Sequence, residues 1–160
     1  MSAHQTDNGF AAYEAKQSRF DKVWEQILPH NKAVLFDALA SAGIECVILE
    51  FDGYGDDGQF QGTTAYHAGV EHGLKEGTDV PVVSVILKSV VFDTGEVEEK
   101  SVLLASAIEE MVSDFLEDTH DGWEDGEGAF GHFRLSVPDR SITLEYNERY
   151  IETNFEEHSF

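Results

Sequence analysis

Residues 44–66, IECVILEFDGYGDDGQFQGTTAY, decide the fold. Ile44 to Phe51 is rich in Ile, Val, Leu and Phe and is too short for a typical helix, which predicts a strand. Glycines recur in FDGYGDDGQF, and glycine readily takes the positive φ angles of tight turns. Gln59 to Tyr66 then predicts a second strand. The whole stretch therefore predicts a β-hairpin.

Upstream of this hairpin, apolar residues recur at helical spacing. From Phe10 to Leu28 the periodicity predicts a helix, which Pro29 is expected to interrupt. Asn31 is then a suitable N-cap for a second helix, and Gly43 is a suitable residue to end it. Two helices are therefore expected before the hairpin, with residues 1–30 forming an N-terminal helical extension.

Downstream, residues 67–79 mix glycine with charge and predict a loop, whereas Val80 to Phe92 predicts a long strand. A further helix is expected from about Ser101 to Glu117, because its apolar residues form one stripe. A polar, glycine-rich loop follows, DTHDGWEDGEGAFG. Two last strands are expected around Phe133–Val137 and Ile142–Tyr146, because apolar residues alternate along both. Ile142, Leu144 and Tyr146 are then expected to face inward.

The expected order of elements is ααβββαββ. This order predicts an α+β domain with a mainly antiparallel sheet of about five strands, covered by helices. Since a domain usually has about 100 to 200 residues, residues 31–160 are expected to form a single one.

The chain is strongly acidic, with 32 Asp and Glu against 10 Lys and Arg and a formal net charge of -22. From Asp93 to Phe160 there are 19 acidic and 4 basic residues, so the acidity is concentrated in the C-terminal part. Proteins that bind nucleic acid need clustered Lys or Arg, so direct binding of nucleic acid is not expected. The same field favours encounter with a cationic partner, whether a basic protein groove, a metal ion or a positively charged small molecule. An acidic surface also keeps a protein soluble without any ligand, which is the simpler interpretation.

No apolar run approaches the roughly 20 residues that span a membrane. The start, MSAHQTDNGF, lacks the segments of a signal peptide, so a cytoplasmic protein is expected. Cys46 is the only cysteine, which excludes an intramolecular disulfide and predicts a buried core residue. The sequence has no dinucleotide-binding, phosphate-binding or nucleophile-elbow motif, and this favours a protein without catalytic activity.

Two glycine-rich acidic segments are candidate metal sites, because carboxylate oxygens are the ligands that Ca2+ and Mg2+ prefer. Neither segment matches a calcium-binding EF-hand loop. In the alternative interpretation, the first is a plain hairpin turn and the second a solvated loop. The metal hypothesis rests on Asp52, Asp56, Asp57, Asp121, Asp125 and Glu127.

The second segment and the last strand are also the candidate surface for a basic partner. Trp123 either covers the core or stands on the surface as an anchor. Glu145 belongs to a polar face of the last strand, where pairing with Arg134 would explain it without a ligand. The residues expected to contact a partner are Asp118, Asp121, Trp123, Glu124, Asp125, Glu127, Glu145 and Glu148.

Three stretches carry a family resemblance: EFDGYGDDGQF, FLEDTHDGWEDGEGAFGHF, and ITLEYNERY with the final EEHSF. Together they resemble an uncharacterised family of small acidic proteins from bacteria, plasmids and phages, which is defined only as a domain of unknown function. The similarity covers roughly residues 31–160. The resemblance implies a setting of mobile elements and their hosts, and it implies no catalytic or binding residue.

Two functions remain open at this point. In the first, the chain is a non-enzymatic monomer or dimer that occupies a basic groove of a partner, such as a nucleic-acid-binding protein. An inhibitor of host defence that mimics DNA would act in this way. In the alternative, the two acidic segments converge on a divalent metal ion, Ca2+ or Mg2+, in a structural or hydrolytic site.

Overall fold

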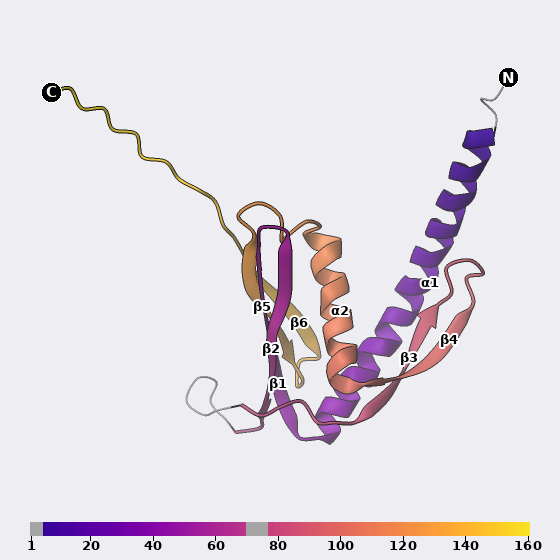
Figure 1. Cartoon of the computed structure of the whole chain (residues 1–160). Coiled ribbons are helices and arrows are strands. Elements are labelled where there is room, and N and C mark those ends of the chain that lie inside the picture. Colours follow the sequence, from indigo (N-terminus) through magenta and orange to yellow (C-terminus); the bar gives the residue numbers. More distant parts are fainter. Residues whose placement is uncertain (1–4, 70–76) are drawn as a thin grey trace. The chain divides into compact units, whose positions relative to one another are not determined.

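The computed structural model describes residues 5–69 and 77–160 (Figure 1). The chain forms two compact units: unit 1 comprises residues 1–42 and 81–107, and unit 2 comprises residues 43–80 and 108–160. The α+β class with antiparallel strands is confirmed, although the described residues hold six strands and two helices. In chain order these are α1 (Gln5–Ser41), β1 (Ile44–Tyr54), β2 (Asp57–His67), β3 (Ser84–Val90), β4 (Val97–Leu103), α2 (Leu104–Thr119), β5 (Ala129–Ser136) and β6 (Ser141–Glu148).

In unit 1, α1 is one continuous helix of 37 residues with Pro29 inside it, so the predicted break is wrong. An internal proline removes one helical hydrogen bond and costs about 3 kcal/mol. Burial of Ile27, Leu35 and Phe36 on either side of it offsets that cost. The predicted boundary between residues 30 and 31 falls inside this helix. Among the described residues, neither helix has the length and hydropathy that a membrane span requires.

Asn31 is not the predicted N-cap. Its side chain is 2% exposed, and its amide group donates a hydrogen bond to the Lys88 carbonyl oxygen at 2.8 Å. Its carbonyl oxygen accepts one from the Lys88 backbone N–H, also at 2.8 Å. A carboxamide offers the same donor and acceptor as a peptide group, so Asn31 pairs with β3 as a neighbouring strand would.

Replacing Asn31 with alanine is expected to lower the free energy of unfolding by about 2–3 kcal/mol, because both polar backbone groups of Lys88 lose their partner. The matched control is Gln17→Ala, which removes an exposed amide bonded to Asp21 in the same helix. Urea denaturation of both variants measures the difference. Equal, small losses would show that the Asn31 bonds do not stabilise unit 1.

The antiparallel pair of β3 and β4 completes unit 1. The predicted strand from Val80 to Phe92 is shortened to Ser84–Val90, and the helix predicted from Ser101 begins at Leu104. The missed strand β4 contains Glu98, Glu99 and Lys100, whose side chains are exposed. Glu and Lys are rare in strands, which explains why the sequence pattern did not reveal this one.

Unit 2 contains a four-stranded antiparallel sheet in the order β2-β1-β5-β6. The predicted hairpin is confirmed as β1 and β2, and its two turn residues, Gly55 and Asp56, have φ angles of 56° and 65°. A two-residue turn with both φ angles positive fits the right-handed twist of paired strands. Of the predicted loop 67–79, residues 70–76 lie outside the described residues, and Thr78 forms an isolated bridge with Ala65.

One face of this sheet forms the core of unit 2. In register, Val47 lies opposite Leu135 and Leu49 opposite Phe133, and all four are buried. The buried stripe of α2 covers this face, and Cys46 is buried as predicted. The stripe comprises Ile108, Met111, Val112 and Leu116. The other face of the sheet carries the polar side chains, in agreement with the predicted alternation along the last two strands.

Candidate functional site

Two loops of unit 2 meet at one end of the sheet. They are the β1–β2 turn and the segment 120–128 that follows α2. The backbone N–H of Gly55 donates to the Gly126 carbonyl oxygen at 3.2 Å, and that of Asp56 donates to the Glu124 carbonyl oxygen at 3.1 Å. The two segments that the metal hypothesis singled out therefore converge, held by backbone hydrogen bonds.

Trp123 fixes the second loop against the hairpin. Its ring meets Phe51 edge to face, with centroids 5.3 Å apart and planes at 80°. A Cβ atom added at Gly53 or at Gly58 would lie 2.5 Å from the indole, so both positions need glycine for this close approach. Of the two predicted arrangements, the indole adopts the one that covers the core.

Carboxyl groups from both loops crowd beside this tryptophan. A hydrogen bond between the side chains of Asp125 and Asp56 raises the pKa of Asp125 above its usual range. Partial desolvation and the charges of Glu124, Asp56 and Asp121 raise this pKa further. The pair therefore retains a proton more readily than an isolated aspartate does.

The stability that this pair contributes is expected to fall as the pH rises. The contribution is fully present below the unfolded pKa, about 3.9, and is lost as the pH passes the raised folded pKa of Asp125. We expect Asp56→Asn to return the pKa of Asp125 toward its usual range and to flatten this pH dependence, because it removes the carboxyl partner. The turn should be preserved, because Asn also tolerates a positive φ angle. Carboxyl NMR titration and urea denaturation measure the two effects, with Asp57→Asn as the control. An unchanged Asp125 titration in Asp56→Asn would contradict the pairing.

Beside the two loops lies a pocket of about 420 Å³, which we call the loop pocket. The rings of His120 and Tyr146 stack there, with centroids 3.7 Å apart and planes at 16°. The pocket thus joins the end of α2, the loop and the end of β6. It is lined by His120, Asp121, Gly122, Trp123, Asp125, Gly126, Glu127, Gly128, Tyr146, Glu148 and Arg149.

The pKa of Tyr146 reflects the burial and the negative charges around the loop pocket. Burial raises the pKa of its phenol, and the charges of Glu148 and Glu124 raise it further. A raised phenol pKa means that a second negative charge at this position is disfavoured. Tyr146 is therefore neutral at physiological pH and remains able to donate a hydrogen bond.

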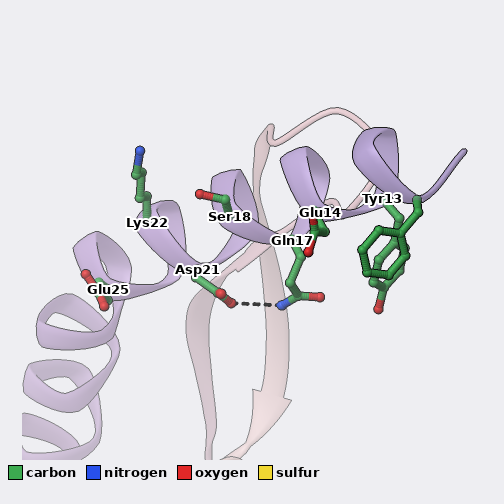
Figure 2. Close-up of a pocket in the computed structure, with 8 residues that line it drawn as sticks. Tyr13, Glu14, Gln17, Ser18, Asp21, Lys22 and Glu25 are labelled. Carbon is green, nitrogen blue, oxygen red and sulfur yellow. Dashed lines mark hydrogen bonds between the residues drawn. The ribbon is translucent and has the colours of Figure 1, made fainter. Parts of the chain in front are cut away.

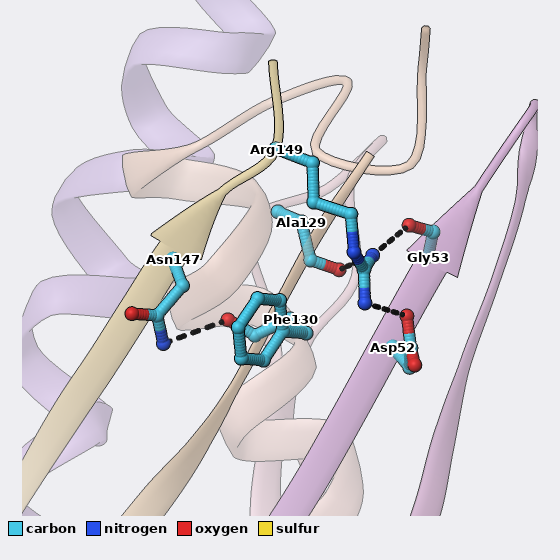
Figure 3. Close-up of polar contacts among 6 residues, drawn as sticks. All are labelled: Asp52, Gly53, Ala129, Phe130, Asn147 and Arg149. Carbon is cyan, nitrogen blue, oxygen red and sulfur yellow. Dashed lines mark hydrogen bonds and ion pairs between the residues drawn. The ribbon is translucent and has the colours of Figure 1, made fainter. Parts of the chain in front are cut away.

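Arg149 anchors the end of β6 to β1 and β5 (Figure 3). One guanidinium nitrogen lies 2.8 Å from the Asp52 carboxylate, and the other donates to the Gly53 carbonyl oxygen at 3.0 Å. The guanidinium carbon is 4.6 Å from the centroid of the Phe130 ring. Although Arg149 lines the loop pocket, its charge is already engaged by Asp52.

The predicted metal ligands are only partly brought together. Asp56 and Asp125 share a hydrogen bond, and Asp121 is close enough to act on the pKa of Asp125. Asp52 instead pairs with Arg149. Within residues 5–69 and 77–160, no group of three or more His, Cys, Asp or Glu side chains is placed to hold a metal ion.

The predicted partner-binding residues fall in three places. Five of them line the loop pocket, and Glu124 lies in the same loop. The five are Asp121, Trp123, Asp125, Glu127 and Glu148. Asp118 lies in the last turn of α2.

Glu145 points to the opposite face of the sheet, where its carboxylate is 3.9 Å from a ring nitrogen of His132. The expected pairing of Glu145 with Arg134 is replaced by this one, because Glu145 lies opposite His132 and Arg134 lies opposite Thr143. The prediction missed His120, Tyr146 and Arg149 as pocket residues, although Tyr146 was expected to face inward.

A second pocket, of about 470 Å³, lies in unit 1 along one face of α1 (Figure 2). All of its lining residues belong to this helix, from Phe10 at one end to Glu25 at the other. Within it the Gln17 side chain donates to Asp21 at 2.9 Å. A groove made by a single helix face brings no chemical groups together from distant parts of the chain, so the loop pocket is the better candidate site.

Fold and site together define an α+β protein with an acidic, aromatic-walled pocket at one end of an antiparallel sheet. The chain belongs to a family of unknown function, DUF6878, whose model matches residues 27–160. The prediction of an uncharacterised domain family, over roughly residues 31–160, is therefore confirmed, and the match begins four residues earlier. No curated protein and no solved structure matches the chain.

Proposed function

We propose that the chain is a non-enzymatic binding protein whose acidic unit 2 occupies a basic surface of a partner protein. The distribution of charge between the units carries this proposal. Unit 2 has 23 acidic and 4 basic residues, a net charge of -19, whereas unit 1 has 9 acidic and 6 basic residues, a net charge of -3. Acidity needed only for solubility would have no reason to collect in one unit.

Most carboxylates of unit 2 lie on its surface. Of its 21 acidic residues in the described part of the chain, 17 are exposed and none is buried. Those of α2 occupy the side turned away from the buried stripe and continue into the following loop. We call this surface the acidic strip: Glu109, Glu110, Asp114, Glu117, Asp118, Asp121, Glu124, Asp125 and Glu127.

The spacing of the acidic strip resembles that of phosphates in DNA. Five carboxylates lie between Glu109 and Asp118, a distance of about 13.5 Å along a helix that rises about 1.5 Å per residue. Five charges are separated by four intervals, so the mean spacing is roughly 3.4 Å per charge. This is close to the spacing along one DNA strand, about 3.4 Å. We therefore propose a partner that binds nucleic acid in the cytoplasm, such as a host-defence protein, with this chain as a DNA mimic.

The acidic strip is expected to cost stability, as a surface kept for binding would. Asp118 lies in the last turn of α2, which has no basic residue, and a negative charge there opposes the helix dipole. We expect Asp118→Asn to raise the free energy of unfolding by about 0.5 kcal/mol. Glu109→Gln is the matched control, since it removes the same charge outside the last turn. Urea denaturation tests this, and a loss of stability in Asp118→Asn would contradict it.

Capture of partners from host lysate tests the proposal. Purified full-length chain serves as bait at low and at high salt, and the captured proteins are identified by mass spectrometry. Since attraction between exposed charges is screened by salt, we expect nucleic-acid-binding proteins to be enriched at low salt and released at high salt. Capture that is insensitive to salt, or that lacks such proteins, would count against the proposal.

A divalent-metal site is the second candidate, favoured by the meeting of Asp56 and Asp125. A cation would take the place of the shared proton and relieve the repulsion between the two carboxylates. Thermal melts with Ca2+, Mg2+, Mn2+ and EDTA test this candidate, because a ligand that binds only the folded state raises the melting temperature. If none of these four additions alters the melting temperature, the metal-site candidate is excluded.

A further inference from the structure

We propose that the loop pocket binds one organic cation, a guanidinium or alkylammonium group, between its aromatic side chains and its carboxylates. This inference rests on the proposed function, because a basic partner would supply such a group from an Arg or Lys side chain. A free diamine or guanidine compound carries the same chemistry. The pocket would then be the point at which a partner is recognised in detail, within a wider electrostatic surface.

The aromatic side chains of the loop pocket fit a cation. His120, Tyr146 and Trp123 all line it. His120 stacks on one face of Tyr146, with the planes at 16°, and Phe51 also stacks on Tyr146, so the Trp123 indole is the ring that a cation would meet. A cation within about 6 Å of an aromatic ring face is attracted by the ring quadrupole, most strongly for Trp and Tyr. A volume of about 420 Å³ lies in the range of small-ligand sites, roughly 300–1,000 Å³.

The charged side chains around the loop pocket are mostly negative, which suits a positively charged ligand. Four carboxylates line it, those of Asp121, Asp125, Glu127 and Glu148. The one Lys or Arg in the lining, Arg149, has its guanidinium 2.8 Å from Asp52. A ligand that brings its own positive charge is therefore favoured, and an anion is disfavoured.

Two titrating groups of the lining agree with this sign. Carboxylate charges raise the pKa of Asp125 and also that of Tyr146, although a hydrogen bond is the first cause for Asp125 and burial for Tyr146. Both shifts show that the lining disfavours added negative charge.

An organic cation fits the described residues better than a metal ion does. A divalent metal needs several oxygen atoms converging on one point, and no such group of three occurs in the described parts of the chain. A guanidinium is flat, spreads its charge over five N–H donors and stacks on aromatic rings. Carboxylates that are spread around a pocket can each accept a hydrogen bond from one of those N–H groups.

The test measures binding of defined cations to the full chain. The chain has two tryptophans, so Trp24→Phe leaves Trp123 as the only indole reporter. Methylguanidinium and butylamine probe the small-molecule source. A short peptide with one arginine probes the protein source, and the same peptide with neutral citrulline is its control. Binding is followed by Trp123 fluorescence and by NMR shifts of the Tyr146 ring.

Two variants of β6 form the matched pair for this test. Glu148→Gln removes a carboxylate of the loop pocket, whereas Glu145→Gln removes one from the opposite face of the same strand. Both side chains are exposed, so neither change should unfold the protein. We expect Glu148→Gln to weaken binding of the arginine peptide about 5-fold and Glu145→Gln to leave it within about 2-fold.

The outcomes separate this inference from the proposed function. Saturable binding of a cationic probe, with no binding of the citrulline peptide and with the expected difference between variants, supports the pocket. Binding of methylguanidinium but not of the peptide would identify a small-molecule site, even if no basic partner is captured. Equal weakening of binding in both variants, or Tyr146 signals that do not shift, would contradict cation binding in the loop pocket. Salt-sensitive capture of basic partners would still support the proposed function.

Discussion

Replacing Phe51 with alanine is expected to lower the free energy of unfolding by about 3–5 kcal/mol. The side chain is 1% exposed in the middle of β1. Its ring contacts four other aromatic rings, with centroids between 5.3 and 6.5 Å away. Alanine would leave a cavity beneath the loop pocket, so the variant should also lose the fixed position of Trp123. The four partners are Phe60, Trp123, Phe133 and Tyr146.

The matched control is Phe130→Ala. Phe130 lies in β5 of the same sheet, and its side chain is 43% exposed on the polar face, beside the Arg149 guanidinium. Its removal should cost no more than about 1 kcal/mol. Urea denaturation, followed by circular dichroism and Trp123 fluorescence, compares the two variants. Similar losses for both would contradict the assignment of Phe51 to the centre of the unit 2 core.

Neutralising part of the acidic strip should have the largest effect on partner binding. Each exposed carboxylate that faces a cation contributes about 0.2–1 kcal/mol, so five replacements are expected to weaken binding roughly 5- to 5,000-fold. Affinity for the captured partner is measured by calorimetry or interferometry at fixed salt, since the attraction is screened. The variant combines Glu109→Gln, Glu117→Gln, Asp118→Asn, Asp121→Asn and Glu127→Gln.

A control with the same net charge separates location from total charge. Five carboxylates of unit 1 are replaced by their amides, which removes the same number of negative charges as the strip variant does. We expect this control to retain the partner affinity within about 3-fold, because these groups lie outside unit 2. Equal weakening by both variants would show that overall charge, and not the acidic strip, governs binding. The control residues are Glu14, Glu25, Glu96, Glu98 and Glu99.

Where a local pattern determines structure, the sequence was sufficient to predict it. The β1–β2 hairpin follows from a short apolar run, glycines and a second alternating run, and Gly55 takes the positive φ angle that was expected. The stripe of α2 and the inward alternation of β5 and β6 follow in the same way. In each case, neighbours in the sequence hold the deciding information.

Tertiary contacts explain what the sequence could not predict. Nothing near Pro29 indicates that burial of the surrounding helix outweighs the lost hydrogen bond, and nothing near Asn31 points to Lys88, 57 residues away. The loop pocket likewise needs His120 and Tyr146, which are distant in sequence and meet only when α2 packs on the sheet. The acidic residues of the site and Trp123 were predicted from the sequence, whereas the stacked pair of His120 and Tyr146 was not.

Competition with DNA tests the central claim most directly. A captured nucleic-acid-binding partner is loaded with labelled duplex DNA and titrated with the full chain, while anisotropy reports the bound duplex. If the acidic strip occupies the groove that binds DNA, the chain should displace the duplex fully, and the strip variant should need a much higher concentration. A stable complex of partner, duplex and chain would contradict the claim, and so would direct, tight binding of the duplex by the chain itself at physiological salt.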